Sequence, residues 1–138
     1  MADGLLIVSD IKVRYSGIPV IHGLSLTVNN GETVCVVGAN GAGKSALLKG
    51  LMGAVRIFDG TVVFEGTEIQ TLKTEEIVKK GITYVPEERM LFTPLSVEEN
   101  LLLGAYTLSD KDQISMNLQF VYTLFPVLRE RRYQAAST

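Results

Sequence analysis

The first half of the chain alternates apolar and polar positions over short stretches, a pattern typical of strands buried on one face. An extended segment begins at residues 5–8 and continues through 11–15, where apolar and basic residues alternate. A turn over 16–19 separates it from a second apolar segment, which the turn residues Asn29-Asn30-Gly31 end. The alternation predicts strands over 5–15, 20–28, 58–66 and 67–70.

Two other runs are apolar at nearly every position and rich in β-branched residues. Residues 33–37 read Thr-Val-Cys-Val-Val, and residues 82–85 read Ile-Thr-Tyr-Val before a proline. Continuous apolar runs of this length are typical of strands covered on both faces in a parallel sheet. We expect both runs as buried strands, with Cys35 filling the core rather than acting as a nucleophile.

Helical signals begin after the first of these runs. Residues 46–52 are rich in helix formers and are followed by Gly53, a residue that commonly ends helices. Thr74 is the expected N-cap of a second helix, with acidic residues in its first turn, lysines in its last turn and Gly81 after it.

The pattern from residue 96 onward is helical. Ser96 and Glu99 have the spacing of a capping box, which predicts a helix to about residue 104. Ser109 and Asp112 predict a further helix start, and Pro126 is expected to end that helix. Its apolar residues recur on one face, which we interpret as core or interface: Ile114, Leu118, Val121, Tyr122 and Phe125.

The composition is that of an ordinary globular domain, with 46% hydrophobic residues, 20% charged residues and a net charge of −2. There is no basic field of the kind that attracts nucleic acid, so we expect no nucleic-acid partner. No uninterrupted apolar stretch approaches the roughly 18 residues that cross a bilayer, and the N-terminus lacks the cationic start of a secretion signal. The single cysteine fits a reducing compartment, and we expect a cytoplasmic location.

The strongest chemical signal is a glycine-rich loop. Residues 38–45 read Gly-Ala-Asn-Gly-Ala-Gly-Lys-Ser, which matches the phosphate-binding pattern G-x-x-x-x-G-K-[ST] without a mismatch. The loop lies between an expected strand and an expected helix, the order that this motif requires. We call residues 38–45 the phosphate loop.

The chemistry of such a loop follows from the start of a helix. The first backbone N–H groups of a helix have no partner within it and carry partial positive charge, so they bind a phosphate. Lys44 adds a point charge for the terminal phosphates, and the Ser45 hydroxyl can join the coordination of Mg²⁺. Three glycines allow the backbone to curl around the anion: Gly38, Gly41 and Gly43.

With these motifs in this order, the chain resembles the ATP-binding subunit of an ABC transporter, over its whole length but only from the family's N-terminus to somewhat past its middle. The resemblance implies an α/β fold of the phosphate-loop NTPase type, with N-terminal antiparallel strands, a partial parallel core and an incomplete helical subdomain. It implies one truncated ATP-binding domain over 1–138, divided into a nucleotide-binding core part (1–95) and the start of the helical subdomain (96–138). The implied cofactors are ATP and Mg²⁺.

Two shorter segments extend the resemblance. Tyr15, in the run Val-Arg-Tyr-Ser-Gly, matches the aromatic residue that stacks on adenine in the family. Residues 84–87 resemble the segment where most members carry a glutamine that touches Mg²⁺ and the attacking water. Glu87 stands there, as a candidate catalytic and metal-binding residue. This glutamate, the following Arg89 and the segments 92–101 and 125–132 are similar to the branched-chain amino acid importer branch.

Some residues depart from the family pattern. Ala46 stands where the family usually has threonine or serine, and Glu88 stands where the importer branch has glycine. His22 is not at the position of the family's switch histidine, and we interpret it as a surface or strand-end residue. We expect Ser45 and Glu87 at the metal, and the following residues at the nucleotide: Tyr15, Gly38, Asn40, Gly41, Ala42, Gly43, Lys44, Ser45 and Ala46.

The resemblance also shows what the 138 residues do not contain. They include no L-S-G-G signature, no apolar strand ending in Asp-Glu and no switch histidine. In the family, hydrolysis occurs in a head-to-tail dimer in which the phosphate loop of one subunit faces the signature of the other. We therefore expect nucleotide binding with hydrolysis near background. A missing central strand leaves open sheet edges, so we also expect an isolated chain to self-associate.

The leading interpretation is the ATP-binding subunit of an ABC import system of the branched-chain amino acid type, at the inner face of the cell membrane. It would contact transmembrane permease subunits through the region from Glu87 to Leu101 and pair with a second ATP-binding subunit. A second interpretation is a truncated, non-catalytic chain that binds nucleotide or a partner without turnover. Other phosphate-loop proteins are a third, although the chain has no Asn-Lys-x-Asp guanine reader. A soluble ABC ATPase acting on DNA or ribosomes is disfavoured by the acidic balance.

Overall fold

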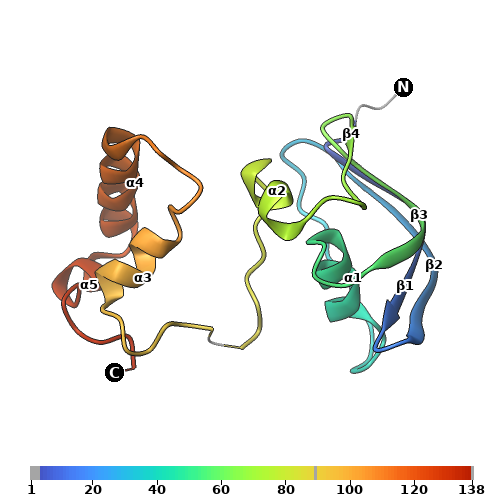
Figure 1. Ribbon diagram of the computed structural model, residues 1–138, viewed down its shortest axis with the longest axis horizontal. Helices are drawn as coiled ribbons and strands as arrows, with labels where there is room; N and C mark the ends of the chain where they lie inside the picture. Colours follow the sequence, from blue (N-terminus) through green and yellow to red (C-terminus); the bar gives the residue numbers. More distant parts are fainter. Residues whose placement is uncertain (1–3, 89, 138) are drawn as a thin grey trace. The chain divides into compact units, whose positions relative to one another are not determined.

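The computed structural model describes residues 4–88 and 90–137 (Figure 1). Contacts divide the chain into two units, the first up to Tyr84 and the second from Val85 onward. The sequence placed a subdomain boundary at 95–96, within the second unit, and the union of both units in one ATP-binding domain stays a prediction. Arg89, one of the residues behind the family resemblance, lies outside the described residues.

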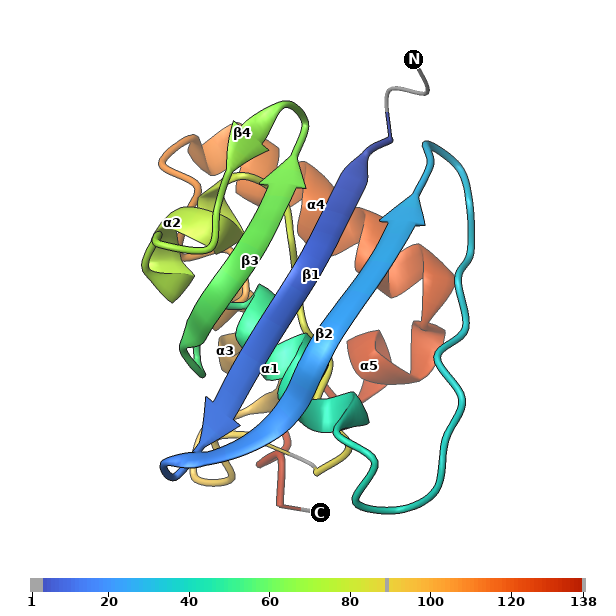
Figure 2. The ribbon, with the colours of Figure 1, turned by 90° about the vertical axis from the view of Figure 1, so that its right-hand side faces the viewer.

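The first unit is built on an antiparallel sheet with the strand order β2-β1-β3-β4 (Figure 2). The antiparallel strands expected from the alternating pattern are confirmed, with ends shifted by one or a few residues. Their bounds are Leu6–Tyr15 for β1, Ile18–Val28 for β2, Ile57–Phe64 for β3 and Thr67–Glu68 for β4.

A bulge in β1 keeps the apolar residues of this central strand on one face. Between the pairs Val8–Leu26 and Ile11–Leu24, β1 advances by one residue more than β2, and a similar shift occurs against β3. Asp10, within the bulge, has a φ of 47°. An extra residue moves the inward and outward alternation by one position. The strand therefore buries Val8 and Ile11 although their spacing is odd.

Two helices complete the core of this unit. α1 (Lys44–Leu51) contributes Leu47 and α2 (Thr74–Lys79) contributes Ile77, and both side chains are almost fully buried against the strands. Burying one such aliphatic side chain contributes about 2 kcal/mol. The expected cap of α2 at Thr74 is wrong by one residue. Lys73 is the cap, and its backbone N–H donates to the Glu76 carboxylate over 2.9 Å.

The two runs expected as buried parallel strands do not form strands. Residues 33–37 and 82–85 have no regular secondary structure and join no ladder with any described segment; in Figure 2 the first run is part of the long loop beside β2. Val37 is 85% exposed and Val85 is 89% exposed. A parallel strand requires neighbouring strands to satisfy its backbone and cover its faces, and no described segment supplies them. Cys35, expected in the core, is consequently exposed.

The second unit contains α3 (Val97–Leu103), α4 (Lys111–Leu124) and α5 (Pro126–Glu130). The capping box of α3 is confirmed, because the Glu99 N–H donates to Ser96 Oγ over 3.2 Å and the Ser96 N–H donates to the Glu99 carboxylate over 2.7 Å. The expected start of α4 at Ser109 is wrong by one residue. Asp110 is the cap, since its carboxylate accepts hydrogen bonds from two backbone amides of the first turn.

Pro126 acts as a helix start as well as a helix stop. α4 ends at Leu124, and Pro126 then opens α5 at a first-turn position. Proline is tolerated there because the missing N–H has no intrahelical acceptor in any case. The expected end of the longer helix is therefore confirmed, and a short helix follows it.

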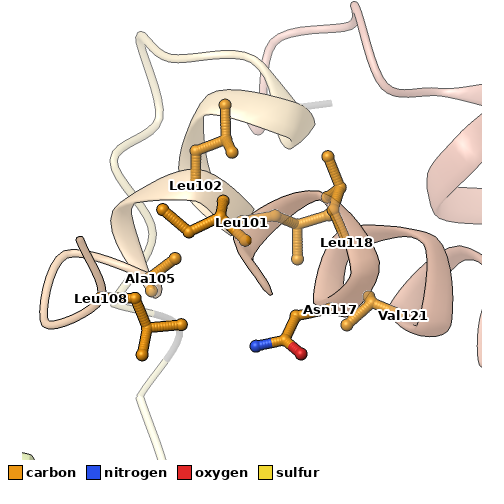
Figure 3. A pocket seen from close by; sticks show the side chains of 9 residues that line it. Leu101, Leu102, Ala105, Leu108, Asn117, Leu118 and Val121 are labelled. Carbon is orange, nitrogen blue, oxygen red and sulfur yellow. The ribbon is translucent and has the colours of Figure 1, made fainter. Parts of the chain in front are cut away.

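The expected apolar stripe of α4 contributes to this unit unevenly. Tyr122 is only 5% exposed, whereas Phe125 is exposed. The remaining stripe residues, Ile114, Leu118 and Val121, line an open hollow of about 190 Å³ together with Leu101 and Leu102 of α3. Figure 3 shows Leu118 and Val121 at this hollow.

Tyr122 also ties α4 to α3 through a polar contact. Its hydroxyl donates to the Glu98 carboxylate over 2.8 Å. The end of the chain joins the same region, since the Val97 N–H donates to the Gln134 carbonyl over 3.0 Å and the Ala136 N–H donates to the Leu95 carbonyl over 2.9 Å. The start of α3 is thus held by both α4 and the C-terminal segment.

No helix in the described part of the chain combines the length and the apolar character needed to span a bilayer.

Tyr122→Phe should make the stability of the protein less dependent on alkaline pH, because it removes the hydroxyl that donates to Glu98. Burial, with the Glu98 carboxylate as a further cause, raises the pKa of Tyr122 from 10.0 to about 12. The folded state therefore favours the neutral phenol. The contribution of neutral Tyr122 to the free energy of unfolding is complete below pH 10.0 and is lost as the pH rises toward about 12. Urea unfolding followed by circular dichroism should show this decline in the wild type and a smaller decline in Tyr122→Phe. At neutral pH the variant should be less stable by about 1 kcal/mol.

Tyr106→Phe is the matched control, because Tyr106 is largely exposed. The control should keep the wild-type response to alkaline pH. An equal decline in the wild type and Tyr122→Phe would contradict the assignment of the raised pKa to this contact.

Candidate functional site

The phosphate loop has a backbone that only glycine adopts readily. Gly43 caps α1 with a φ of 94°, and Gly41 has a φ of 83°. A β-carbon on Gly43 would lie 3.1 Å from the carbonyl oxygen of Val20 on β2. Both the left-handed conformation and this close approach require glycine at residue 43.

α1 presents its N-terminus without a competing side chain. Gly43 offers no side-chain cap, and the first turn contains no acidic residue. The first intrahelical bond runs from the Leu47 N–H to the Gly43 carbonyl over 2.9 Å. The earlier amides therefore have no acceptor within the helix, and the helix dipole makes this end positive. An anion is the natural partner for such a terminus.

The Lys44 side chain folds back over the phosphate loop. Its ammonium donates to the carbonyl oxygens of Gly38 and Ala39, over 2.7 Å and 2.9 Å. The ammonium thus lies over the start of the loop, and it carries a third donor for an anion. The charge and the helix N-terminus act on the same small region, which favours a group with several negative charges.

The other loop residues expected at the nucleotide lie next to these groups. The Ala42 N–H donates to the Ala39 carbonyl over 3.1 Å, which closes a turn around Asn40. The Ser45 side chain is exposed in the first turn of α1, and Ala46 follows it there. The structure brings together the expected residues from Gly38 to Ala46, although their roles at a nucleotide stay predictions.

Tyr15 also lies beside α1. It ends β1 and pairs with Ile18 across a hairpin whose two central residues, Ser16 and Gly17, have φ values of 50° and 84°. The Lys49 Nζ lies over the Tyr15 ring, 5.7 Å from its centre. The expected adenine-stacking residue is therefore next to the helix that the phosphate loop opens. The sequence reading missed Lys49, because no motif marks a lysine that meets a tyrosine from another element.

An open hollow of about 280 Å³ adjoins the phosphate loop. β2 forms one side with Val20 and Leu24, and the unpaired run 33–37 contributes two valines. His22 also lines the hollow, as an exposed residue of β2, which agrees with its interpretation as a surface residue.

The chemistry of the loop fits Mg-ATP. Mg²⁺ commonly takes one or two protein ligands together with phosphate oxygens and water. The described residues hold no cluster of three or more His, Cys, Asp or Glu side chains suited to a metal. An exposed Ser45 hydroxyl at a phosphate-binding terminus suits a cation that arrives with the phosphates.

Glu87 belongs to the second unit, where it is exposed. Ser45 belongs to the first unit, and the roles of Glu87 at the metal and in catalysis stay predictions. Glu88 is exposed as well.

The segment after Glu87 is held by Asn100 of α3. The Asn100 side-chain amide donates to the carbonyls of Phe92 and Ser96, over 3.0 Å and 2.9 Å, and its oxygen accepts from the Phe92 N–H over 2.9 Å. This clamp fixes residues 92–96 while the apolar side chains of Met90, Leu91 and Phe92 remain exposed.

The chain is similar to known proteins over most of its length. The family model described as ABC transporter matches residues 21–136. The high-affinity branched-chain amino acid transport ATP-binding protein BraG of Pseudomonas aeruginosa is 41% identical over 93% of this chain. The probable branched-chain amino acid transport ATP-binding protein LivF of Archaeoglobus fulgidus is 34% identical over the same share. The chain spans about half of both relatives, 54% of each.

A solved structure shares the fold. It is a nucleotide-free ATP-binding cassette from an ABC transporter, with a TM-score of 0.78 at 21% identity, and the match covers 97% of this chain and 58% of that one. This likeness confirms the expected fold class, an α/β phosphate-loop NTPase of the ABC type. Given the phosphate loop, the shared fold and the match over residues 21–136, the chain belongs to the ABC transporter family.

Proposed function

We propose that the chain is the nucleotide-binding part of an ATP-binding subunit in a branched-chain amino acid import system. The observation that carries this proposal is the phosphate loop, where the Lys44 ammonium lies over a helix start that no side chain caps. The names of the two relatives support the solute class, since both are branched-chain amino acid transport ATP-binding proteins.

Different residues would bind the phosphates, the base and the metal of Mg-ATP. The amides at the start of α1 and the Lys44 ammonium bind the phosphates, and the Tyr15 ring stacks on the base. The Ser45 hydroxyl ligates Mg²⁺, and Glu87 is the proposed second protein ligand. Bound ATP supplies a phosphoanhydride bond whose cleavage releases free energy for transport. Ala46 offers no hydroxyl, so its contribution is restricted to its backbone amide.

The exposed residues of the second unit and the names of the relatives support the proposed protein partners. We assign the region from Glu87 to Leu101 to contacts with transmembrane permease subunits, at the inner face of the cell membrane. The exposed apolar residues 90–92 suit such a contact, because the Asn100 clamp holds the adjoining backbone in one conformation. A second ATP-binding subunit would be the other partner.

A second candidate function is nucleotide binding without turnover. The 138 residues contain neither an L-S-G-G signature nor an apolar strand ending in Asp-Glu. Phosphoryl transfer depends on positioned water and on stabilised charge, and these motifs provide both in the family. The two candidates share ATP binding and differ in hydrolysis.

Lys44→Ala should lower ATP affinity about 100-fold, because it removes a charged donor at the phosphates. The fold should persist, since within the described part of the chain the Lys44 ammonium donates to two carbonyls of its own loop and to no other element. Calorimetric titration with Mg-ATP measures the affinity, and thermal unfolding checks the fold. Lys79→Ala, on α2, is the matched control for loss of one positive charge. Equal ATP affinity in the wild type and Lys44→Ala would show that the nucleotide binds elsewhere.

The purified 138-residue chain should release phosphate from ATP at a rate near the uncatalysed background, because its sequence supplies no catalytic carboxylate after an apolar strand. Lys44→Ala serves as the control for contaminating ATPases. Turnover that is present in the wild type and absent in Lys44→Ala would exclude the non-catalytic candidate.

The isolated chain should self-associate, because residues 33–37 expose an apolar run that pairs with no strand of the described residues. Val34→Lys should reduce this association, since a charge on this exposed run opposes its pairing with a strand of another copy. Light scattering over a concentration series measures the effect. Val127→Lys is the control, because it adds the same charge at a half-exposed position on α5. A wild-type chain that stays monomeric throughout would refute the expectation.

A further inference from the structure

Lys49 makes a contact with Tyr15 that phosphate binding does not explain. Its ammonium lies 5.7 Å from the centre of the Tyr15 ring, within the roughly 6 Å at which a cation is attracted to an aromatic face. Tyr15 is nevertheless 48% exposed. The ring therefore carries a cation on one side and retains open surface for another partner.

The contact depends on how closely α1 approaches β1. Gly50, the residue after Lys49, is buried, and a β-carbon on it would lie in ordinary van der Waals contact with Val13 Cγ2, at 3.4 Å. Val13 is two residues before Tyr15 on β1, so α1 packs on this strand close to the Tyr15 ring. This packing places Lys49 near the ring.

The backbone of Tyr15 is fixed as well. Ser16 and Gly17 both have positive φ, which is the two-residue hairpin turn whose twist matches that of the flanking strands. Tyr15 and Ile18 close this hairpin as a pair, and Ile18 is 66% exposed. The side-chain torsions of Tyr15 are the freedom that remains, and the Lys49 ammonium restricts them.

We propose that Lys49 is a positioning residue for the nucleobase: it holds the Tyr15 ring so that the free side of the ring stacks on a purine. This inference rests on the proposed function, because it requires that Tyr15 binds the base of ATP. Stacking on an aromatic ring is stronger when the ring is already oriented, since less side-chain entropy is lost on binding.

A competing role is purely structural. Lys49 is in the last turn of α1, where any cation stabilises the helix dipole. Lys79 has the same place on α2. Lys79→Gln is therefore a matched control for Lys49→Gln, because it removes one cation from the last turn of a helix in the same unit.

The test uses the 138-residue chain and two ligands, Mg-ATP and magnesium tripolyphosphate, titrated by calorimetry. Lys49→Gln should weaken ATP about threefold, as expected for the loss of an exposed cation–π contact. Its affinity for tripolyphosphate, which has no base, should equal that of Lys79→Gln. Lys49→Arg should restore ATP affinity, since a guanidinium also attracts an aromatic face.

Two further measurements separate positioning from charge. In a Tyr15→Leu background, Lys49→Gln should have no additional effect on ATP, since the ring it positions is gone. The fluorescence of 2-aminopurine riboside triphosphate, which stacking quenches, should be less quenched by Lys49→Gln than by the wild type. Lys49→Met, which keeps most of the aliphatic chain, replaces Lys49→Gln if that variant does not fold.

The outcomes distinguish this inference from the proposed function. Equal weakening of ATP and tripolyphosphate in Lys49→Gln, or no weakening of ATP, overturns the role of Lys49 and leaves the nucleotide site in place. Unchanged quenching, or an undiminished effect in the Tyr15→Leu background, overturns it too. A wild-type chain that binds neither ligand overturns the proposed function and this inference together.

Discussion

The close contact of α1 with the sheet is the constraint on which the candidate site depends. A β-carbon at Gly43 would lie 3.1 Å from the Val20 carbonyl, and one at Gly50 would lie 3.4 Å from Val13. Gly43 thus lets the start of α1 lie directly on β2, and Gly50 lies against β1. The first contact places the start of α1 beside the phosphate loop, and the second lies next to the Lys49–Tyr15 contact. The proposed binding of the phosphates and the proposed stacking of the base therefore both depend on the packing of α1 against the sheet.

The features that the sequence predicted correctly depend on neighbouring residues. The capping box at Ser96 and the phosphate loop form within a few residues of chain, where each bond is specified by its own motif. The alternating strands carry their own apolar pattern, although β1 pairs with the distant β3. The errors in helix starts are of the same local kind. At α4 the carboxylate of Asp110 accepts hydrogen bonds from two backbone amides, so Asp110 is the cap rather than Ser109, one residue earlier.

The features that the sequence did not predict depend on partners that lie far away in the chain. The composition of residues 33–37 indicates that they can form a strand, but strand formation also requires a neighbour, and no described segment pairs with them. Cys35 is exposed for this reason rather than because of its own chemistry. The contact of Lys49 with Tyr15 is also non-local, since it depends on the distance between a helix and a hairpin.

The residues of the proposed site are divided between the two units of the chain. The phosphate loop, Tyr15 and Lys49 all belong to the first unit, so the contacts proposed for the phosphates and the base need no residue from the second. Glu87 and the exposed apolar residues 90–92 belong to the second unit, and they are assigned to the metal and to the permease. The proposed binding of the phosphates and the base therefore rests on the first unit, whereas the proposed coupling of that binding to a partner requires the second.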